Sequence, residues 1–267
     1  MLRETDLFGK TTDKVQKAMR KLRFLQPPEG YYVAFSGGKD SMVILDLVKR
    51  AGVKYDAHHN LTTVEPPELI YYIREHYPEV ITEHPKETMW ELIERNMVPP
   101  TRLMRYCCQE LKERGGEGRV VITGIRHQES TQRSHRMEQE ACTHRNGKSF
   151  LHIIIDWSEE DVWEYIREQN LPYCKLYDEG LHRIGCVMCP FHGAAGMRQD
   201  AAQWPKIAQA YKLACGRAYE RRIKAGKETS WKSGDDMYNW WIANRKEKEV
   251  LGQRSFQFGL YNGEEYT

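Results

Sequence analysis

The chain has 267 residues, of which 40 are Lys or Arg and 38 are Asp or Glu, and 40% of the residues are hydrophobic. A chain of this length buries one substantial core. No segment approaches the ~20 apolar residues that a membrane span needs, and the first residues lack the apolar stretch of a secretory signal, so we expect a cytoplasmic protein without a membrane partner. The net charge of +2 leaves nucleic-acid and small-molecule partners open.

The seven cysteines are odd in number and unevenly spaced, and two of them, Cys107 and Cys108, are adjacent. This is not the pattern of a secreted disulfide scaffold. In a reducing cytosol, metal binding or redox chemistry explains such cysteines better than disulfide bonds do.

Apolar periodicity predicts an alternation of helices and strands along the first two thirds of the chain. The predicted helices span 14–25, 42–48, 67–76, 88–95, 106–114 and 159–169, and the predicted strands span 31–35, 54–60, 79–82, 119–123 and 151–155. This alternation is typical of an α/β fold with a doubly wound, mostly parallel sheet and helices on both faces.

After Pro172 the composition changes to a loop rich in Cys, Gly and His, which runs to about residue 196. Two further helices are predicted at 205–225 and 235–250, forming a helical tail. We therefore expect an N-terminal helix at 1–28, an α/β nucleotide-binding domain with the Cys-bearing loop at 29–196, and a helical C-terminal extension at 197–267.

The strongest motif is the loop Ser36-Gly-Gly-Lys-Asp-Ser41, which follows a predicted strand and precedes a predicted helix. In this context backbone N–H groups and the helix N-terminus converge on an anion. Gly37 and Gly38 let the backbone approach phosphate oxygens, Lys39 supplies a charge, and the two serine hydroxyls donate further hydrogen bonds. Asp40 can orient the loop or hold Mg²⁺. The alternative is an ordinary glycine turn with a serine cap.

The loop resembles the Ser-Gly-Gly-x-Asp-Ser loop of the PP-loop ATP pyrophosphatases, which cleave ATP between the α and β phosphates and adenylate a substrate oxygen. Later blocks resemble the phosphoadenosine phosphosulfate reductase branch of that superfamily, also called the adenine nucleotide alpha hydrolases. These blocks are Thr123–Ser130 with Arg133, Asp156–Ile166, Leu176–Gly180 and Arg183–Pro190. The resemblance runs from about residue 30 to about residue 192 and implies ATP, or a sulfonucleotide, as the ligand.

A second phosphate-binding wall is expected after the predicted strand that ends at Thr123-Gly124. Ligands of open parallel sheets bind outside the carboxyl ends of the strands. The side chains expected to face the same crevice as the loop are Arg126, Glu129, Ser130 and Arg133. Together with Lys39 and Asp40, the two arginines are the candidate catalytic residues. The alternative is that both arginines belong to a solvated basic stretch with His135 and Arg136.

Cys186-Val-Met-Cys189 has the spacing at which two thiolates reach one metal centre. Cys107-Cys108 is the strongest candidate for a second half-site, and because adjacent side chains diverge, the pair favours a cluster with several irons over one zinc ion. Cluster-bearing reductases and the related DNA phosphorothioation sulfurtransferases share this arrangement, which implies a 4Fe-4S cluster on these four cysteines. The alternatives are metal-free thiols, or zinc with Cys142 or His144 as a further ligand.

In the tail, Lys and Arg outnumber Asp and Glu between residues 205 and 248, and Trp231, Tyr238, Trp240 and Trp241 are interleaved with them. This composition suits a nucleic-acid surface. The alternative is a solvated helix face whose aromatic residues pack into the core.

These features lead to the hypothesis of an ATP-dependent iron-sulfur enzyme that adenylates an acceptor oxygen, on nucleic acid, releases pyrophosphate and transfers sulfur. A sulfur-donor protein and a homo-oligomer are compatible with it. The first alternative is a reductase of phosphoadenylyl or adenylyl sulfate, with Cys174 as the nucleophile. Assimilatory reductases carry their attacking cysteine near the C-terminus, whereas nothing after Cys215 is a cysteine. The second alternative is a nucleotide- or nucleic-acid-binding module without chemistry.

Overall fold

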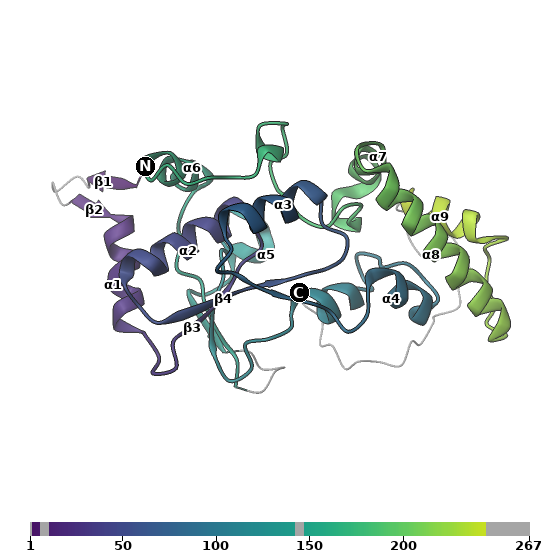
Figure 1. Cartoon of the computed structure of the whole chain (residues 1–267), viewed down its shortest axis with the longest axis horizontal. Coiled ribbons are helices and arrows are strands. Elements are labelled where there is room, and N and C mark those ends of the chain that lie inside the picture. The colour runs from purple at the N-terminus through teal and green to yellow at the C-terminus, as the bar shows by residue number, and fades with distance from the viewer. Residues whose placement is uncertain (1, 6–10, 142–146, 244–267) are drawn as a thin grey trace. The chain divides into compact units, whose positions relative to one another are not determined.

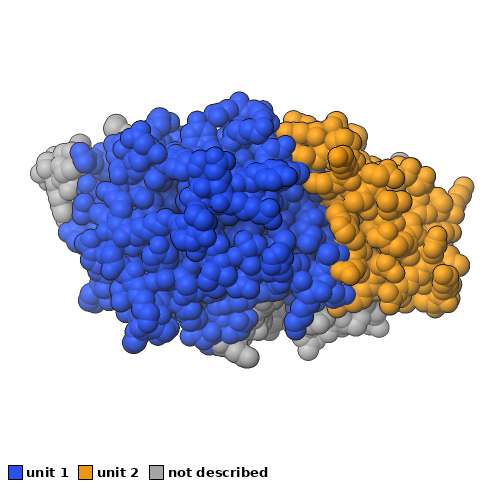
Figure 2. Space-filling view, in the orientation of Figure 1, with its two compact units in different colours: residues 1–89, 106–187 blue, residues 90–105, 188–267 orange. Residues whose placement is uncertain are grey.

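The structure is a computed structural model that describes residues 2–5, 11–141 and 147–243. The chain divides into two compact units, which Figure 2 colours separately: unit 1 comprises residues 1–89 and 106–187, and unit 2 comprises residues 90–105 and 188–267. The three-part division expected from the sequence stays a prediction.

Unit 1 is built on a six-stranded sheet in the order β5-β4-β3-β6-β8-β7; Figure 1 labels its strands β3 and β4. Its strands are β3 (Tyr31–Ala34), β4 (Tyr55–Asn60), β5 (Ile81–Glu83), β6 (Val120–Ile122), β7 (Gln139–Ala141) and β8 (Ser149–Leu151). Every neighbouring pair is parallel except β7 with β8. A separate antiparallel hairpin joins β1 (Arg3–Thr5) to β2 (Thr11–Asp13). The predicted α/β class with a mostly parallel sheet is confirmed.

The α-helices of unit 1 are α1 (Lys14–Phe24), α2 (Lys39–Ala51), α3 (Pro67–His76), α5 (Thr131–Ser134) and α6 (Glu159–Glu168). Helix α4 (Met89–Asn96) has its first residue in unit 1 and the rest in unit 2. Short turns of other helix types are η1 (Cys108–Lys112), η2 (His127–Glu129) and η3 (Lys175–Tyr177). Helix α2 packs against α1, α6 and β3, so it forms the centre of the helical layer in this unit (Figure 1).

The sequence explains where α2 begins and ends. Gly38 is its N-cap, and Gly52 closes it in the left-handed region at φ 68°, where glycine has no steric penalty. Between these glycines most side chains are apolar and buried. Burial on this scale, at about 25 cal/mol per Å² of apolar surface, fixes α2 and the loop that precedes it onto the sheet.

In unit 2 the described helices are α4 from Trp90 onward, α7 (Gly193–Gln203), α8 (Pro205–Lys224) and α9 (Gly234–Ile242), and the turn η4 (Pro190–His192) precedes α7. Helices α8 and α9 pack against each other. Their core is aromatic: Tyr211 lies edge-on to Trp90, with 4.9 Å between ring centroids, and 4.6 Å from Trp241. The Trp241 indole donates to the carbonyl of Pro100.

Three parts of the element prediction differ from the structure, and a fourth lies partly outside the described residues. The strand expected at 151–155 is β8 at Ser149–Leu151, followed by a turn. Helix α7 begins inside the segment expected to be a loop. The hairpin β1-β2, β7 and α5 are not predicted by periodicity because each has only three or four residues. The last predicted helix extends past Ile242 into residues outside the described part of the chain.

Across the described residues, no helix has both the length and the apolar character to cross a membrane.

Candidate functional site

The loop at residues 36–41 lies where the order of the sheet reverses. From β3 the chain moves outward through β4 to β5, and β6 then pairs with the other side of β3. In open α/β sheets, ligands bind outside the carboxyl ends of the strands at this switch point. The loop follows β3, and Thr123-Gly124 follows β6. The two segments that the sequence predicts to line one crevice are therefore neighbours at the sheet edge.

Gly37 is required by the fold of the loop. It has φ 72°, and a Cβ there would lie 2.8 Å from methyl carbons of Leu69 and Ile73. A larger residue would therefore be strained in its backbone and would clash with α3. The hydroxyl of Ser41 donates to the Gly38 carbonyl at 2.8 Å, which holds the turn closed over the start of α2. The first N–H groups of a helix lack intrahelical partners and attract anions.

Lys39 is buried, with 4% of its surface exposed. Its ammonium donates to the carbonyl oxygen of His182 at 3.2 Å and lies 3.5 Å from Oε1 of Glu159. Its backbone N–H donates to the phenolic oxygen of Tyr177 at 2.8 Å. Burial raises the pKa of Tyr177, so the phenol is neutral at physiological pH. These contacts connect the loop to the segment at 175–182.

Gly124 brings the second wall against the loop. A Cβ at this position would lie 2.9 Å from Cβ of Asp40 and 3.0 Å from its carbonyl carbon. Two residues later, the Nε of Arg126 donates to Oδ1 of Asp40 at 2.6 Å, and Arg126 is only 3% exposed. The other oxygen of Asp40 lies 3.5 Å from the Lys39 ammonium. Asp40 therefore fixes two buried cations beside the loop.

Arg133 adds a third cation and pairs with Glu129 one turn earlier. Burial lowers the pKa of Arg133 to about 10, and the positive charges of Arg183, Arg136 and Arg126 act in the same direction while Asp40 opposes them. A pKa near 10 still leaves Arg133 charged at neutral pH. Mutual repulsion among partly buried cations is relieved by a polyanion, so this cluster favours a ligand with several phosphates. The hydroxyl of Ser130 serves a structural contact, since it caps α5.

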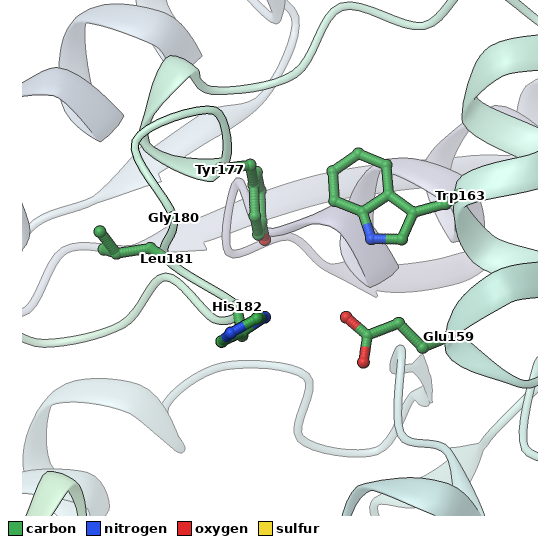
Figure 3. A pocket seen from close by; sticks show the side chains of 6 residues that line it. All are labelled: Glu159, Trp163, Tyr177, Gly180, Leu181 and His182. Atoms are coloured by element: carbon green, nitrogen blue, oxygen red, sulfur yellow. The ribbon is translucent and has the colours of Figure 1, made fainter.

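A pocket of about 250 Å³ opens beside Lys39. Its lining comes from the first turns of α6 and from the segment after η3: Glu159, Trp163, Tyr177, Gly180, Leu181 and His182. Figure 3 shows the Glu159 carboxylate and the His182 ring approaching each other, with the rings of Tyr177 and Trp163 on the opposite side of the opening. Glu159 and Trp163 fall within the block Asp156–Ile166, and His182 lies between the last two blocks, but the sequence alone predicts no role for any of the three because their spacing matches no binding motif.

The profile of the phosphoadenosine phosphosulfate reductase domain matches residues 30–192, which is more than half of the chain. The chain belongs to the phosphoadenosine phosphosulfate reductase family. The match contains the loop at 36–41, the second wall and the Cys186–Cys189 segment.

This family member is similar in sequence to two proteins and in structure to a third. An uncharacterised protein of Methanocaldococcus jannaschii is 32% identical over 188 residues, which are 66% of this chain and 39% of that protein. An adenosine 5'-phosphosulfate reductase of Bacillus anthracis is 29% identical over 203 residues, 70% of this chain and 86% of the reductase. The crystal structure of phosphoadenylyl-sulfate reductase from Candida auris, in complex with phosphate, aligns with a TM-score of 0.50 at 20% identity, covering 66% of this chain and 89% of that chain.

The four cysteines proposed as cluster ligands are divided between the units of this family member. Cys107, Cys108 and Cys186 belong to unit 1, and Cys189 belongs to unit 2. All four are partly exposed. Within the described part of the chain, no three Cys, His, Asp or Glu side chains are gathered closely enough to hold a metal ion. Thiolates suit iron and sulfide as donors, but the described residues do not form a metal site. Cys142 and His144, considered for zinc, lie outside the described residues.

The two remaining described cysteines are poor nucleophiles. Cys174 is 1% exposed, and burial raises the pKa of its thiol. Cys215 is fully buried in α8, and burial raises its pKa to about 12. Thiolate attack requires an exposed thiol with a lowered pKa, which neither residue provides.

In the described part of the tail, the three tryptophans do not form an exposed stacking surface, and Tyr238 is half-buried. Trp231, Trp240 and Trp241 are all buried, which supports the interpretation that they pack in the core. The surplus of basic side chains persists on α8, where Lys206, Arg221 and Lys224 are exposed. Arg245, Lys246 and Lys248 lie outside the described residues.

Proposed function

We propose that this protein uses ATP to adenylate an oxygen atom of an acceptor and then replaces that oxygen with sulfur. The observation that carries the proposal is the pair of buried cations, Lys39 and Arg126, which meet on Asp40 at the switch point of the sheet. The two cations are held in place before the nucleotide binds. Charges positioned in advance in this way accelerate phosphoryl transfer, because they stabilise the charge that develops in the transition state.

In the first step, the acceptor oxygen forms a bond to the α phosphorus of ATP while the bond to the bridging oxygen breaks. Pyrophosphate leaves with the electron pair. The N-terminus of α2 and Lys39 face the charge that develops on pyrophosphate, and Arg126 and Arg133 hold the distal phosphates. In the second step, hydrosulfide supplied by a donor protein forms a bond from its sulfur to the activated atom and gives up its proton, and AMP leaves with the original oxygen and the electron pair of the broken bond.

Mg²⁺ is part of the proposal as a companion of the nucleotide. Mg²⁺ is commonly bound by one or two carboxylates together with substrate phosphates. Asp40 is the carboxylate on the loop, although both its oxygens face cations in the described structure. The ion would therefore be held chiefly by phosphate oxygens, and its role is to neutralise them.

The 4Fe-4S cluster is proposed from the sequence pattern of Cys107, Cys108, Cys186 and Cys189. Because the described residues do not gather a metal site, the proposal requires these thiols to come together when the cluster is inserted. Anaerobically prepared protein should then contain about four irons. Each single Cys→Ala variant should lose most of the iron, and zinc alone after anaerobic expression would overturn the cluster.

The family also contains the reductase alternative, supported by the 29% identity to adenosine 5'-phosphosulfate reductase. We prefer ATP because the described cysteines outside the proposed ligand set are buried and have raised pKa values. An acceptor on nucleic acid is supported by the exposed basic side chains of α8, and a cytoplasmic location by the cysteine pattern.

The deciding experiment measures binding of a non-hydrolysable ATP analogue with Mg²⁺ by calorimetry, and then AMP, pyrophosphate and sulfite formation. Lys39→Ala should weaken analogue binding at least tenfold. Lys17→Ala changes a partly exposed lysine of α1 that pairs with Asp156 and does not contact the loop, so it is the matched control and should bind like wild type. Equal affinity in Lys39→Ala would overturn the loop assignment. Robust sulfite release from adenylyl sulfate would establish the reductase instead.

A further inference from the structure

The pocket beside Lys39 is lined by side chains to which the proposed nucleotide site assigns no role. Glu159 and Trp163 are four residues apart on α6, so they share one face of the helix. Tyr177 and His182 approach from the following segment, and both sides of the pocket belong to unit 1 (Figure 3).

We propose that this pocket binds one nucleobase of the acceptor, and specifically a base that carries an exocyclic amino group. The inference rests on the proposed function, because it names the acceptor that the adenylation site would modify. Its chemical basis lies in the two aromatic rings, the size of the pocket and the carboxylate.

The aromatic rings are arranged to receive a planar group. Trp163 and Tyr177 lie edge to face, with ring centroids 5.2 Å apart and planes at 87°. Two perpendicular rings form a corner in which an inserted ring stacks on one and meets the edge of the other. Stacking on an aromatic side chain is a common way to bind bases of single-stranded nucleic acid.

The size of the pocket selects a single ring system. Sites for whole drug-sized molecules have volumes of roughly 300–1,000 Å³, and this pocket has about 250 Å³. A base fits that space more readily than a complete nucleotide. The sugar and phosphate would then remain outside, toward the opening.

The carboxylate of Glu159 selects a donor group. A carboxylate only accepts hydrogen bonds, and Glu159 is partly exposed, with its Oε1 3.5 Å from the Lys39 ammonium. The amino group of cytosine, adenine or guanine can donate to it, as acidic side chains do with cytosine N4. In the same orientation, uracil and thymine would place a carbonyl oxygen against the carboxylate. Both groups only accept hydrogen bonds, so these bases would bind less tightly. The ion pair with Lys39 also places the base next to the phosphate loop.

The test compares cytidine with uridine by calorimetry, in the presence and absence of a saturating non-hydrolysable ATP analogue. Nucleosides are used because they lack the phosphates that the loop would bind. Wild-type protein should bind cytidine at least tenfold more tightly than uridine under both conditions. Glu159→Gln, whose amide both donates and accepts, should reduce this ratio to about threefold or less.

Matched variants separate recognition from folding. Glu160→Gln changes the adjacent carboxylate, which is exposed and does not line the pocket, so it should keep the wild-type ratio. Trp163→Ala should weaken both nucleosides about tenfold, whereas Trp163→Phe keeps a ring and should bind cytidine within about threefold of wild type. Thermal melting would identify any variant that fails to fold.

Equal binding of cytidine and uridine by wild type would overturn the inference, and so would the absence of nucleoside binding. Loss of cytidine binding when the ATP analogue is present would also overturn it, because the pocket would then belong to the adenine of ATP. Cytidine selectivity without ATP binding would support the assignment of the pocket to a base and contradict the proposed function. ATP binding without cytidine binding would support the proposed function and contradict the assignment of the pocket.

Discussion

The phenolic oxygen of Tyr177 accepts a hydrogen bond of 2.8 Å from the backbone N–H of Lys39. Lys39 is the first residue of α2, so this N–H is one of those that an anion at the helix terminus would use. The ring of the same tyrosine lines the adjacent pocket. Tyr177 is therefore shared by the proposed nucleotide site and the pocket.

Replacing Tyr177 with Phe should affect stability and nucleotide binding in opposite directions. Loss of one hydrogen bond should lower the free energy of unfolding by about 1 kcal/mol. The affinity for an ATP analogue should rise severalfold, because a phosphate no longer competes with the phenol for the Lys39 N–H. Urea denaturation and calorimetry measure the two effects. A fall in affinity would indicate that the hydroxyl contacts the nucleotide directly.

Gly124→Ala should separate the two walls of the nucleotide site. The added methyl would lie 2.9 Å from Cβ of Asp40 and 3.0 Å from backbone, so we expect destabilisation by about 1–3 kcal/mol and weaker ATP binding. Gly185→Ala is the control, since no atom lies within 4 Å of a Cβ there. Equal unfolding midpoints for the two variants would contradict the close packing of Gly124 on the loop.

Asp161 should make unfolding acid-sensitive. Burial alone would raise the pKa of this carboxyl, but Lys14 and the Ser158 N–H outweigh it and lower the pKa to about 2, against 3.8 ordinarily. A lowered folded-state pKa gives stability that is present above pH 4 and is lost as the pH falls toward 2. This contribution is about 2 kcal/mol.

Asp161→Asn should therefore lower the free energy of unfolding by about 2 kcal/mol at pH 7, with the difference from wild type shrinking between pH 4 and pH 2. Chemical denaturation at several pH values measures it. A difference that does not change with pH would show that the carboxylate charge is not the cause.

Thiol alkylation should distinguish the cysteines. Cys174 and Cys215 are buried with raised pKa values, so iodoacetamide at pH 8 should leave both unmodified in folded protein and modify both in urea. Peptide mass spectrometry gives the site occupancy. Rapid native labelling of Cys174 would restore it as a candidate nucleophile for the reductase alternative.

The sequence predicts those parts of the fold that have a strong local signal. The apolar strand, the glycine turn and the helix around residues 31–52 form contiguous patterns, and each was correctly assigned. The apolar run at Ile153–Ile155 predicts a strand, yet these residues are buried in a turn. Apolar composition indicates burial, and it cannot tell a strand from a buried turn over so few residues.

The candidate site was only partly predictable for a related reason. Lys39, Asp40 and Arg126 belong to motifs, and the structure brings them together. Glu159 and His182 reach Lys39 from segments more than a hundred residues away. Such convergence is set by tertiary packing, which leaves no spacing pattern in a single sequence.

The contact between Gly124 and Asp40 has a consequence for redesign. Because there is no room for a methyl group between Gly124 and Asp40, the two proposed phosphate-binding segments should be kept unchanged in a library of variants. Residues 176–183 meet the loop through side chains and single hydrogen bonds. Mutational diversity aimed at a new acceptor therefore belongs in that segment.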